Sequence, residues 1–277
     1  MKETKKNNNN YVHLYGFING IRMNEYDKDG KKMTAINLNV STLETFKKDD
    51  QFVNRRTYHD VSLFTDNKKT IKAFEGVAKN MENDKGPQTI SLDGTLVNKE
   101  GTNDVRIIAK EDSIDLNAKQ ADKEVRNRAE LVGNIAAVNI HEDKNFATVN
   151  LIHHFRPEGA EKEFKTTLQV RIDGDRKFSK DTYEALKNGE LGVGDFVKIG
   201  GQLHNNNYTK EEEKVYGVAL DLTSAEVLHK KGEKKAESAE VKKEAKPAKK
   251  APAKKAEAPA KKAETKKAVS RKKGVKM

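Results

Sequence analysis

The sequence predicts a mainly β protein of two consecutive five-stranded barrels, each with one helix, followed by a disordered basic tail. Short runs of Val, Ile, Leu and aromatic residues recur from Tyr11 onward, and Gly, Asn and Asp clusters separate them. The same order of elements repeats in the second half of the chain. From residue 231 the sequence is low in complexity and consists mainly of Lys, Ala, Glu and Pro, a composition that cannot form a packed core.

The first barrel is expected over residues 11–116, after a polar and disordered N-terminus at residues 1–10. Its apolar runs have the length and composition of strands. Between the third and the fourth run, apolar residues from Ile71 to Met81 follow a helical spacing, and Gly86-Pro87 closes the helix. The expected strands are 12–19, 33–42, 57–64, 89–97 and 105–116, with a helix at 68–83.

The second barrel is expected over residues 128–230, after a charged, helical linker at residues 117–127. The segment LYGFING at 14–20 is echoed by LVGNIAA at 131–137, and TISLDGTL at 89–96 by FVKIGGQL at 196–203, which aligns Gly94 with Gly201. A helix at about residues 180–188 again precedes the fourth strand. Five strands with a helix after the third form the layout of an OB-fold, a small barrel whose face binds oligonucleotides or oligosaccharides.

The charge of the chain is concentrated in its tail. Residues 231–277 hold 18 of the 54 Lys and Arg residues but only 6 of the 43 Asp and Glu residues, so the first 230 residues have a net charge of −1. A near-neutral body with a polycationic tail predicts a polyanionic partner, with nucleic acid preferred. The tail could instead be a solubilising extension, or a segment that binds an anionic membrane surface. Membrane binding is disfavoured because no amphipathic apolar face accompanies these lysines.

Several classes of protein are disfavoured by the sequence. There is no Cys, and the N-terminus has no apolar signal segment. No apolar run approaches the roughly 18 residues of a membrane helix, so we expect a cytoplasmic protein. The glycines of GELGVGDF at 189–196 lack the Lys of a phosphate-binding loop, and neither a metal-ligand cluster nor a catalytic triad is present. We therefore expect no enzyme, no cofactor and no metal.

Four segments of the first repeat carry a resemblance to a known family. They are VHLYGFINGIRM, AINLNVST, RRTYHDVSLF and ISLDGTL, and in this order they resemble strands of bacterial and phage single-stranded DNA-binding proteins over about residues 11–116. The resemblance implies sequence-tolerant binding of single-stranded DNA in replication, recombination or repair. Two such folds in one chain resemble the tandem form of the family, which reaches four folds as a homodimer.

The tail departs from this family, whose members usually end in an acidic segment with an apolar tip that recruits other enzymes. This chain ends in SRKKGVKM, so recruitment by that route is not expected. The repeated PAKKA resembles the tails of linker histones and of some nucleoid proteins, which implies phosphate contacts through counterion release and a nucleoid-associated protein.

The candidate binding residues follow from the resemblance and from the chemistry of single-strand binding, which needs aromatic surfaces and cations along a groove. Even spacing places Tyr58 and Phe64 on one face of the third strand. Both could instead belong to the barrel core, and the nearby cations could be ordinary solvated surface. The predicted DNA-binding residues are Phe46, Lys47, Lys48, Arg55, Arg56, Tyr58, Phe64, Phe155, Arg156 and Tyr208.

The second repeat is expected to bind DNA poorly or to serve in dimerisation, because Thr167 and Asp173 stand where the first repeat has Tyr58 and Phe64. Phe155-Arg156 is expected to replace Phe46-Lys47. His59 alternates to the opposite face, and we interpret it as a packed or interface histidine. Two alternatives for function remain open: RNA as the ligand, and a packaging scaffold in which the tail alone binds nucleic acid.

Overall fold

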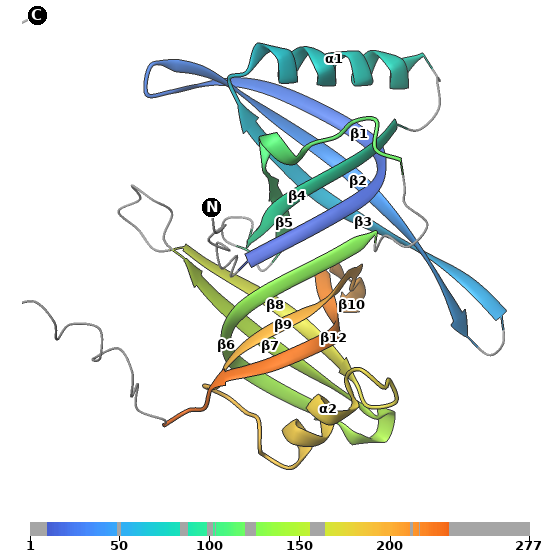
Figure 1. Cartoon of the computed structure of the whole chain (residues 1–277), viewed down its shortest axis with the longest axis vertical. Coiled ribbons are helices and arrows are strands. Elements are labelled where there is room, and N and C mark those ends of the chain that lie inside the picture. The colour runs from blue at the N-terminus through green and yellow to red at the C-terminus, as the bar shows by residue number, and fades with distance from the viewer. Residues whose placement is uncertain are drawn as a thin grey trace, which may run out of the picture. The chain divides into compact units, whose positions relative to one another are not determined.

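Figure 1 shows the computed structural model of the chain. The structure describes residues 10–48, 51–83, 88–98, 102, 104–119, 126–155, 164–210, 213–215 and 217–232. These residues belong to one compact unit that extends to Glu233. The expectations for the N-terminus (residues 1–9) and for the tail beyond residue 232 lie outside the described residues.

The first repeat is a closed barrel of five strands with one helix. Strands β1 and β2 are joined by Asp29 and Gly30, which both have positive φ and close a two-residue hairpin turn. Pairing runs in the order β1–β2–β3–β5–β4 and returns to β1. The elements are β1 (Asn10–Lys28), β2 (Lys31–Lys48), β3 (Gln51–Thr65), α1 (Lys68–Glu82), β4 (Gln88–Asn98) and β5 (Val105–Ala109).

The second repeat closes in the same order, β6–β7–β8–β12–β9 and back to β6. Between its fourth and fifth strands it carries an additional hairpin of two short strands. The elements are β6 (Asn127–His141), β7 (Phe146–Phe155), β8 (Phe164–Asp173), α2 (Lys180–Lys187), β9 (Phe196–Asn205), β10 (Tyr208–Lys210), β11 (Glu213–Val215) and β12 (Val218–His229). The predicted fold class, two OB-folds in tandem, is confirmed.

Alternation along the strands places the apolar side chains inside each barrel. The helix α1 lies against the first barrel and α2 against the second (Figure 1). Asn67 caps the N-terminus of α1 by accepting a hydrogen bond from the backbone N–H of Lys69. Phe74 and Val77 of this helix are buried in the core of the first barrel. Neither helix of the described part of the chain is long and apolar enough to cross a membrane.

The two barrels are joined edge to edge by β1 and β6, which pair antiparallel around Val12 opposite Ala129. On either side of this point Asn10 and Asn127 occupy equivalent positions. The side-chain amide of Asn10 bonds both the N–H and the C=O of Leu96, and that of Asn127 bonds the same groups of Leu203. The junction therefore has an approximate two-fold symmetry between the repeats.

The alignment of Gly94 with Gly201 is confirmed by the strand pairing, since Gly94 lies opposite Val12 and Gly201 opposite the equivalent Ala129. A Cβ on Gly94 would lie 2.6 Å from the carbonyl oxygen of Ile108, and one on Gly201 would lie 2.1 Å from that of Asp221. Only glycine fits where the fourth strand passes this close to the fifth.

Two expectations require correction or fall outside the described residues. The strand predicted over 105–116 ends at Ala109 and continues as a 3₁₀ turn at Glu111–Ser113, because Ser113 folds back to bond the backbone of Asp93 and Lys110. Residues 120–125 of the predicted helical linker are outside the described part, and residue 127 already begins β6.

Candidate nucleic-acid interface

The outer face of β3 carries the aromatic residues that the sequence singled out. Tyr58 and Phe64 are 46% and 41% exposed, whereas His59, Val61 and Leu63 between them are buried. The alternative that these two rings belong to the barrel core is therefore wrong. With about 3.3 Å per residue the two side chains stand roughly 20 Å apart along one strand, a separation that several nucleotides of an extended strand can span.

Phe64 is held in place by a second aromatic residue that sequence reasoning missed. Tyr26, on the β1 arm of the β1–β2 hairpin, meets Phe64 edge to face, with ring centroids 6.3 Å apart and planes at 89°. This geometry is favourable for aromatic pairs, and it fixes the orientation of a half-exposed ring. The signal for Tyr26 lies only in the tertiary structure, because 38 residues separate it from Phe64.

Tyr58 lies where the two repeats meet. Its backbone N–H donates to Oδ1 of Asn205 at 2.7 Å, and its C=O accepts from Nδ2 of the same residue at 2.9 Å. The symmetry-related clamp also exists, since Asn98 makes the same two bonds to the backbone of Thr167. Strand register places Thr167 at the position of Tyr58, so the clamps are equivalent and only one of them presents an aromatic ring.

A cleft of about 290 Å³ opens beside Tyr58. Its walls come from both repeats, with Asp60, Asp104, Val105, Asn205, Asn207, Gly217 and Val218 lining it together with Tyr58. The carboxylates disfavour a phosphate inside the cleft. Amide and carboxylate oxygens suit the amino and imino groups of a nucleobase instead, and the tyrosine supplies a ring on which a base can stack.

Beyond the barrel, β2 and β3 extend as a two-stranded arm (Figure 1). Phe52 and Val53 near its tip are 77% and 36% exposed, and Phe52 is a further aromatic candidate that sequence reasoning missed. Arg56 on the arm is also exposed. Phe46, Lys47 and Lys48 belong to β2 by their backbone pairing, but their side chains lie outside the described residues.

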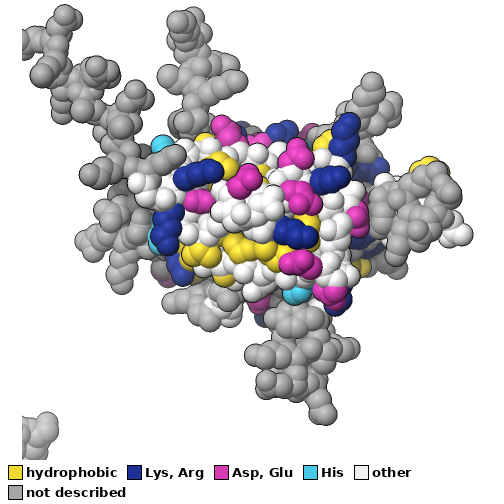
Figure 2. All heavy atoms as spheres, turned by 90° about the horizontal axis from the view of Figure 1, so that it is seen from below, with side chains coloured by type: hydrophobic (Ala, Val, Ile, Leu, Met, Phe, Trp, Pro, Cys, Tyr) yellow, Lys and Arg dark blue, Asp and Glu magenta, His cyan; other side chains and the backbone are white. Residues whose placement is uncertain are grey.

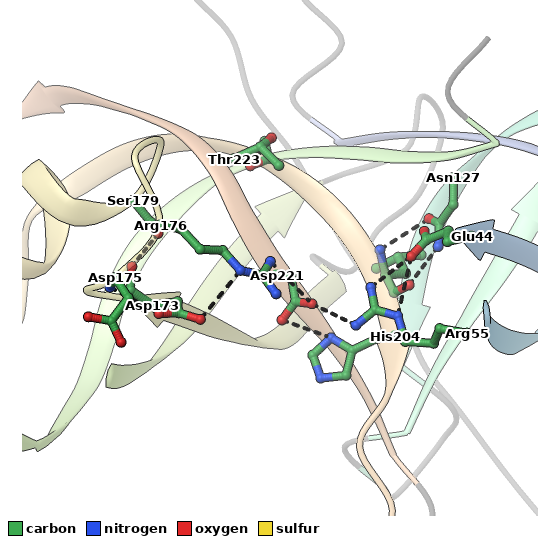
Figure 3. A network of polar contacts seen from close by, with 12 residues as sticks. Glu44, Arg55, Asn127, Asp173, Asp175, Arg176, Ser179, His204, Asp221 and Thr223 are labelled. Atoms are coloured by element: carbon green, nitrogen blue, oxygen red, sulfur yellow. Dashed lines mark hydrogen bonds and ion pairs between the residues drawn. The ribbon is translucent and has the colours of Figure 1, made fainter. Parts of the chain in front are cut away.

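Unlike the exposed Arg56, Arg55 has its guanidinium within a network of ion pairs that joins the repeats (Figure 3). It contacts Glu44 at 2.7 Å on its own arm and Asp221 at 2.9 Å on β12 of the second repeat. Asp221 also lies 3.3 Å from His204 and 3.9 Å from Arg176. Burial lowers the pKa of His204, opposed by the charge of Asp221, so this histidine is neutral at pH 7.

Replacing Arg55 with Met is expected to lower the free energy of unfolding by about 1–3 kcal/mol, because the buried Asp221 loses its closest charged partner. The matched variant Arg56→Met removes the same group from an exposed position and should change stability by less than about 0.5 kcal/mol. Urea unfolding of both variants measures the difference. Equal effects would show that the inter-repeat ion pair contributes nothing.

In the second repeat the predicted positions are less well placed. Phe155 is half-buried, stacks on His153 with centroids 5.6 Å apart, and lies opposite Phe164. Register places it level with Glu44 rather than with Phe46, so it is not the equivalent that the sequence suggested. Arg156 and the side chain of Tyr208 lie outside the described residues.

His59 is a packed histidine in the structure. It is 2% exposed, its Nε2 bonds the hydroxyl of Thr42 at 3.0 Å, and burial lowers its pKa to about 4. Within the described part of the chain its Nδ1 has no hydrogen-bond partner. Among those same residues no group of three or more His, Asp or Glu side chains is arranged to hold a metal ion.

The described surface has no broad cationic area on the side seen in Figure 2. There, Lys and Arg side chains are interspersed with Asp and Glu side chains around a small apolar area. This side of the described surface therefore offers a polyanion a few local cations rather than a large positive field.

Comparison with known proteins gives a structural likeness only. No protein-family model matches the sequence, and no curated protein is similar to it. A mutant of the single-stranded DNA-binding protein from Thermus aquaticus superimposes with a TM-score of 0.50 at 19% identity, covering 80% of this chain and 95% of that one. The wild-type Thermus aquaticus protein has a TM-score of 0.49 at 19% identity, and the match covers 82% of this chain and 96% of that one. The Plasmodium falciparum protein in complex with single-stranded DNA has a TM-score of 0.29 at 15% identity, and the match covers 40% of this chain and 100% of that one. At this level of identity the first likeness shows a shared fold and nothing further.

Proposed function

We propose that the two barrels bind single-stranded DNA without reading its sequence. The observation that carries this proposal is the pair Tyr58 and Phe64, two half-exposed rings on the outer face of β3. The face of the second and third strands is the surface that OB-folds use for oligonucleotides. Each base stacked on an aromatic ring contributes about 1–3 kcal/mol, and every base has such a face.

In this proposal bases turn toward the protein and phosphates turn outward. Tyr58 stacks a base at the mouth of the cleft, where Asp60 and Asp104 oppose phosphate, and Phe64 stacks a second base further along β3. Cations of the β2–β3 arm contact the phosphates, while Arg55 chiefly holds the arm against the second repeat. The proposed contacts are Phe46, Lys47, Lys48, Arg55, Arg56, Tyr58, Phe64, Phe155, Arg156 and Tyr208.

The wider role in this proposal is protection of single strands during replication, recombination or repair, without catalysis. The protein would act in the cytoplasm on the nucleoid or on phage DNA. A homodimer would bring four barrels to one strand, and the basic tail would add phosphate contacts that weaken as salt rises. RNA is the second ligand to test, because stacking alone does not distinguish the two sugars.

A second candidate is a packaging protein whose tail alone binds nucleic acid. The observation in its favour is the charge of the first 230 residues, which sums to −1 although the whole chain carries +11. A tail acting alone is attracted to phosphate whether the nucleic acid is single- or double-stranded. The two candidates therefore differ in their preference for single strands.

Competition among 30-mers of dT, dA, dC and rU and a 30-base-pair duplex tests the proposal on the full chain. We expect the DNA homopolymers to differ from one another by less than about tenfold in Kd, and the duplex to bind at least about tenfold more weakly than any of them. A duplex that competes as well as the single strands would reject base stacking as the mode of binding and favour the packaging protein.

A further inference from the structure

The outer face of the second barrel carries a stack of three side chains. Phe146 begins β7, and the His141 ring lies against it with centroids 4.5 Å apart and planes at 26°. The guanidinium carbon of Arg171, on β8, lies 5.1 Å from the centroid of the same ring. This distance is within the range of a cation–π interaction. Arg171 is exposed, whereas His141 and Phe146 are half-buried.

This stack lies at the position where the first barrel has its aromatic pair. In the first repeat Phe64 on the third strand lies opposite Ala35 on the second. In the second repeat Asp173 on the third strand lies opposite Phe146 on the second. The aromatic ring has thus moved to the neighbouring strand at the same level of the sheet and on the same outer face.

The stack contains one cation, Arg171, that could meet an anionic group of a ligand. Among the described residues no carboxylate lies within 4 Å of the Arg171 guanidinium, in contrast to Arg55. Asp173 is paired with Arg176 at 3.3 Å, and Asp221, the register neighbour of Arg171 on β12, is engaged by Arg55. Among the described residues Arg171 therefore stands beside an aromatic ring without an ion-pair partner, although Glu142 and Asp143 follow His141 in the sequence.

We propose that Arg171, Phe146 and His141 form a second site for the same single strand. An unstacked base lies on the plane of the guanidinium, which Phe146 holds flat, and the adjacent phosphate is neutralised by Arg171. The site rests on the proposed function of the barrels. It assigns nucleic-acid contact to the second repeat through residues other than Thr167 and Asp173, and it makes that repeat a binding module in its own right.

Two variants and one matched control test this site in the full-length protein. Phe146→Leu keeps an apolar side chain but removes the ring, and Arg171→Gln removes the charge from an exposed position. Val193→Ala is the control, because Val193 is 52% exposed and lies between α2 and β9, beside Gly194, whose N–H bonds the C=O of Ile135, six residues along β6 from His141. Circular dichroism and thermal unfolding verify that all three variants are folded.

The readouts are the Kd for a 30-mer of dT and photo-crosslinking to strands that contain 5-iododeoxyuridine. We expect Phe146→Leu and Arg171→Gln to raise the Kd by roughly 5- to 100-fold, with Val193→Ala unchanged. Crosslinks are expected in the peptide that contains residues 141–148 or in that containing Arg171. Wild-type affinity in both variants with no crosslink in either peptide would overturn this site and leave the proposed function intact. A wild-type protein that binds no single strand would overturn both.

Discussion

Replacing Tyr58 and Phe64 together with alanine is expected to weaken single-strand binding by roughly 30-fold to 10⁴-fold, which corresponds to about 2–6 kcal/mol for two lost stacks. The change should fall on affinity rather than on folding, because both rings are more than two-fifths exposed. Anisotropy titration of a labelled dT 30-mer measures the effect.

The control for this pair is Val193→Ala, which truncates an apolar side chain that is 52% exposed. Val193 lies between α2 and β9 and not on β3, so its variant should bind the single strand as the wild type does. An affinity of the Tyr58/Phe64 variant equal to that of the wild type, with an unchanged unfolding temperature, would remove β3 from the binding surface.

Acidification from pH 7 to pH 4 is expected to cost about 3 kcal/mol of stability through His59 alone. Burial lowers the pKa of His59 to about 4 in the folded protein, against about 6.5 in the unfolded chain. The unfolded state therefore takes up the proton first, and stability is lost as the pH falls from 6.5 toward 4. Below pH 4 both states are protonated and this loss stops.

The variant His59→Leu isolates this effect, because the second repeat has Leu168 at the equivalent position and packs it fully inside the barrel. Urea unfolding of wild type and variant from pH 7.5 to pH 3.5 gives the comparison. The wild type should lose about 3 kcal/mol more than the variant over that range. If the free energy of unfolding of wild type and variant changes with pH in parallel, His59 becomes protonated without unfolding, and its burial is not maintained in solution.

The positions of the strands along the chain were predictable from sequence because alternation of apolar residues is a local signal. The same signal underestimated the hairpins: β2 and β3 continue past the barrel through polar residues such as Thr45 and Asn54, whose side chains bond each other at 2.7 Å. The arm is held by backbone pairing and cross-strand contacts rather than by burial, so hydrophobic periodicity does not reveal it. The end of β5 at Ala109 was missed for a related reason, since Ser113 redirects the chain by bonding a residue 20 positions away.

The candidate site was predictable only where one strand defines it. Tyr58 and Phe64 share a face because their spacing is even, and that needs no tertiary information. Asp221, the partner of Arg55 in the second repeat, is 166 residues away in the sequence, so the part of Arg55 in joining the repeats could not be anticipated. The stack around Phe146 was missed because aligning the repeats compares like strands, whereas the ring had moved to the strand opposite.

Whether the barrels themselves bind single-stranded DNA is tested most directly with residues 1–233, the compact unit without its basic tail. Fluorescence anisotropy over a salt series measures the binding of a dT 30-mer and of a duplex to this protein. We expect the tail-free protein to bind the single strand, to prefer it to the duplex by at least about tenfold, and to show a shallower dependence on salt than the full chain. If removal of the tail abolishes single-strand binding, base stacking by the barrels is rejected, and the barrels are then a scaffold for a polycation.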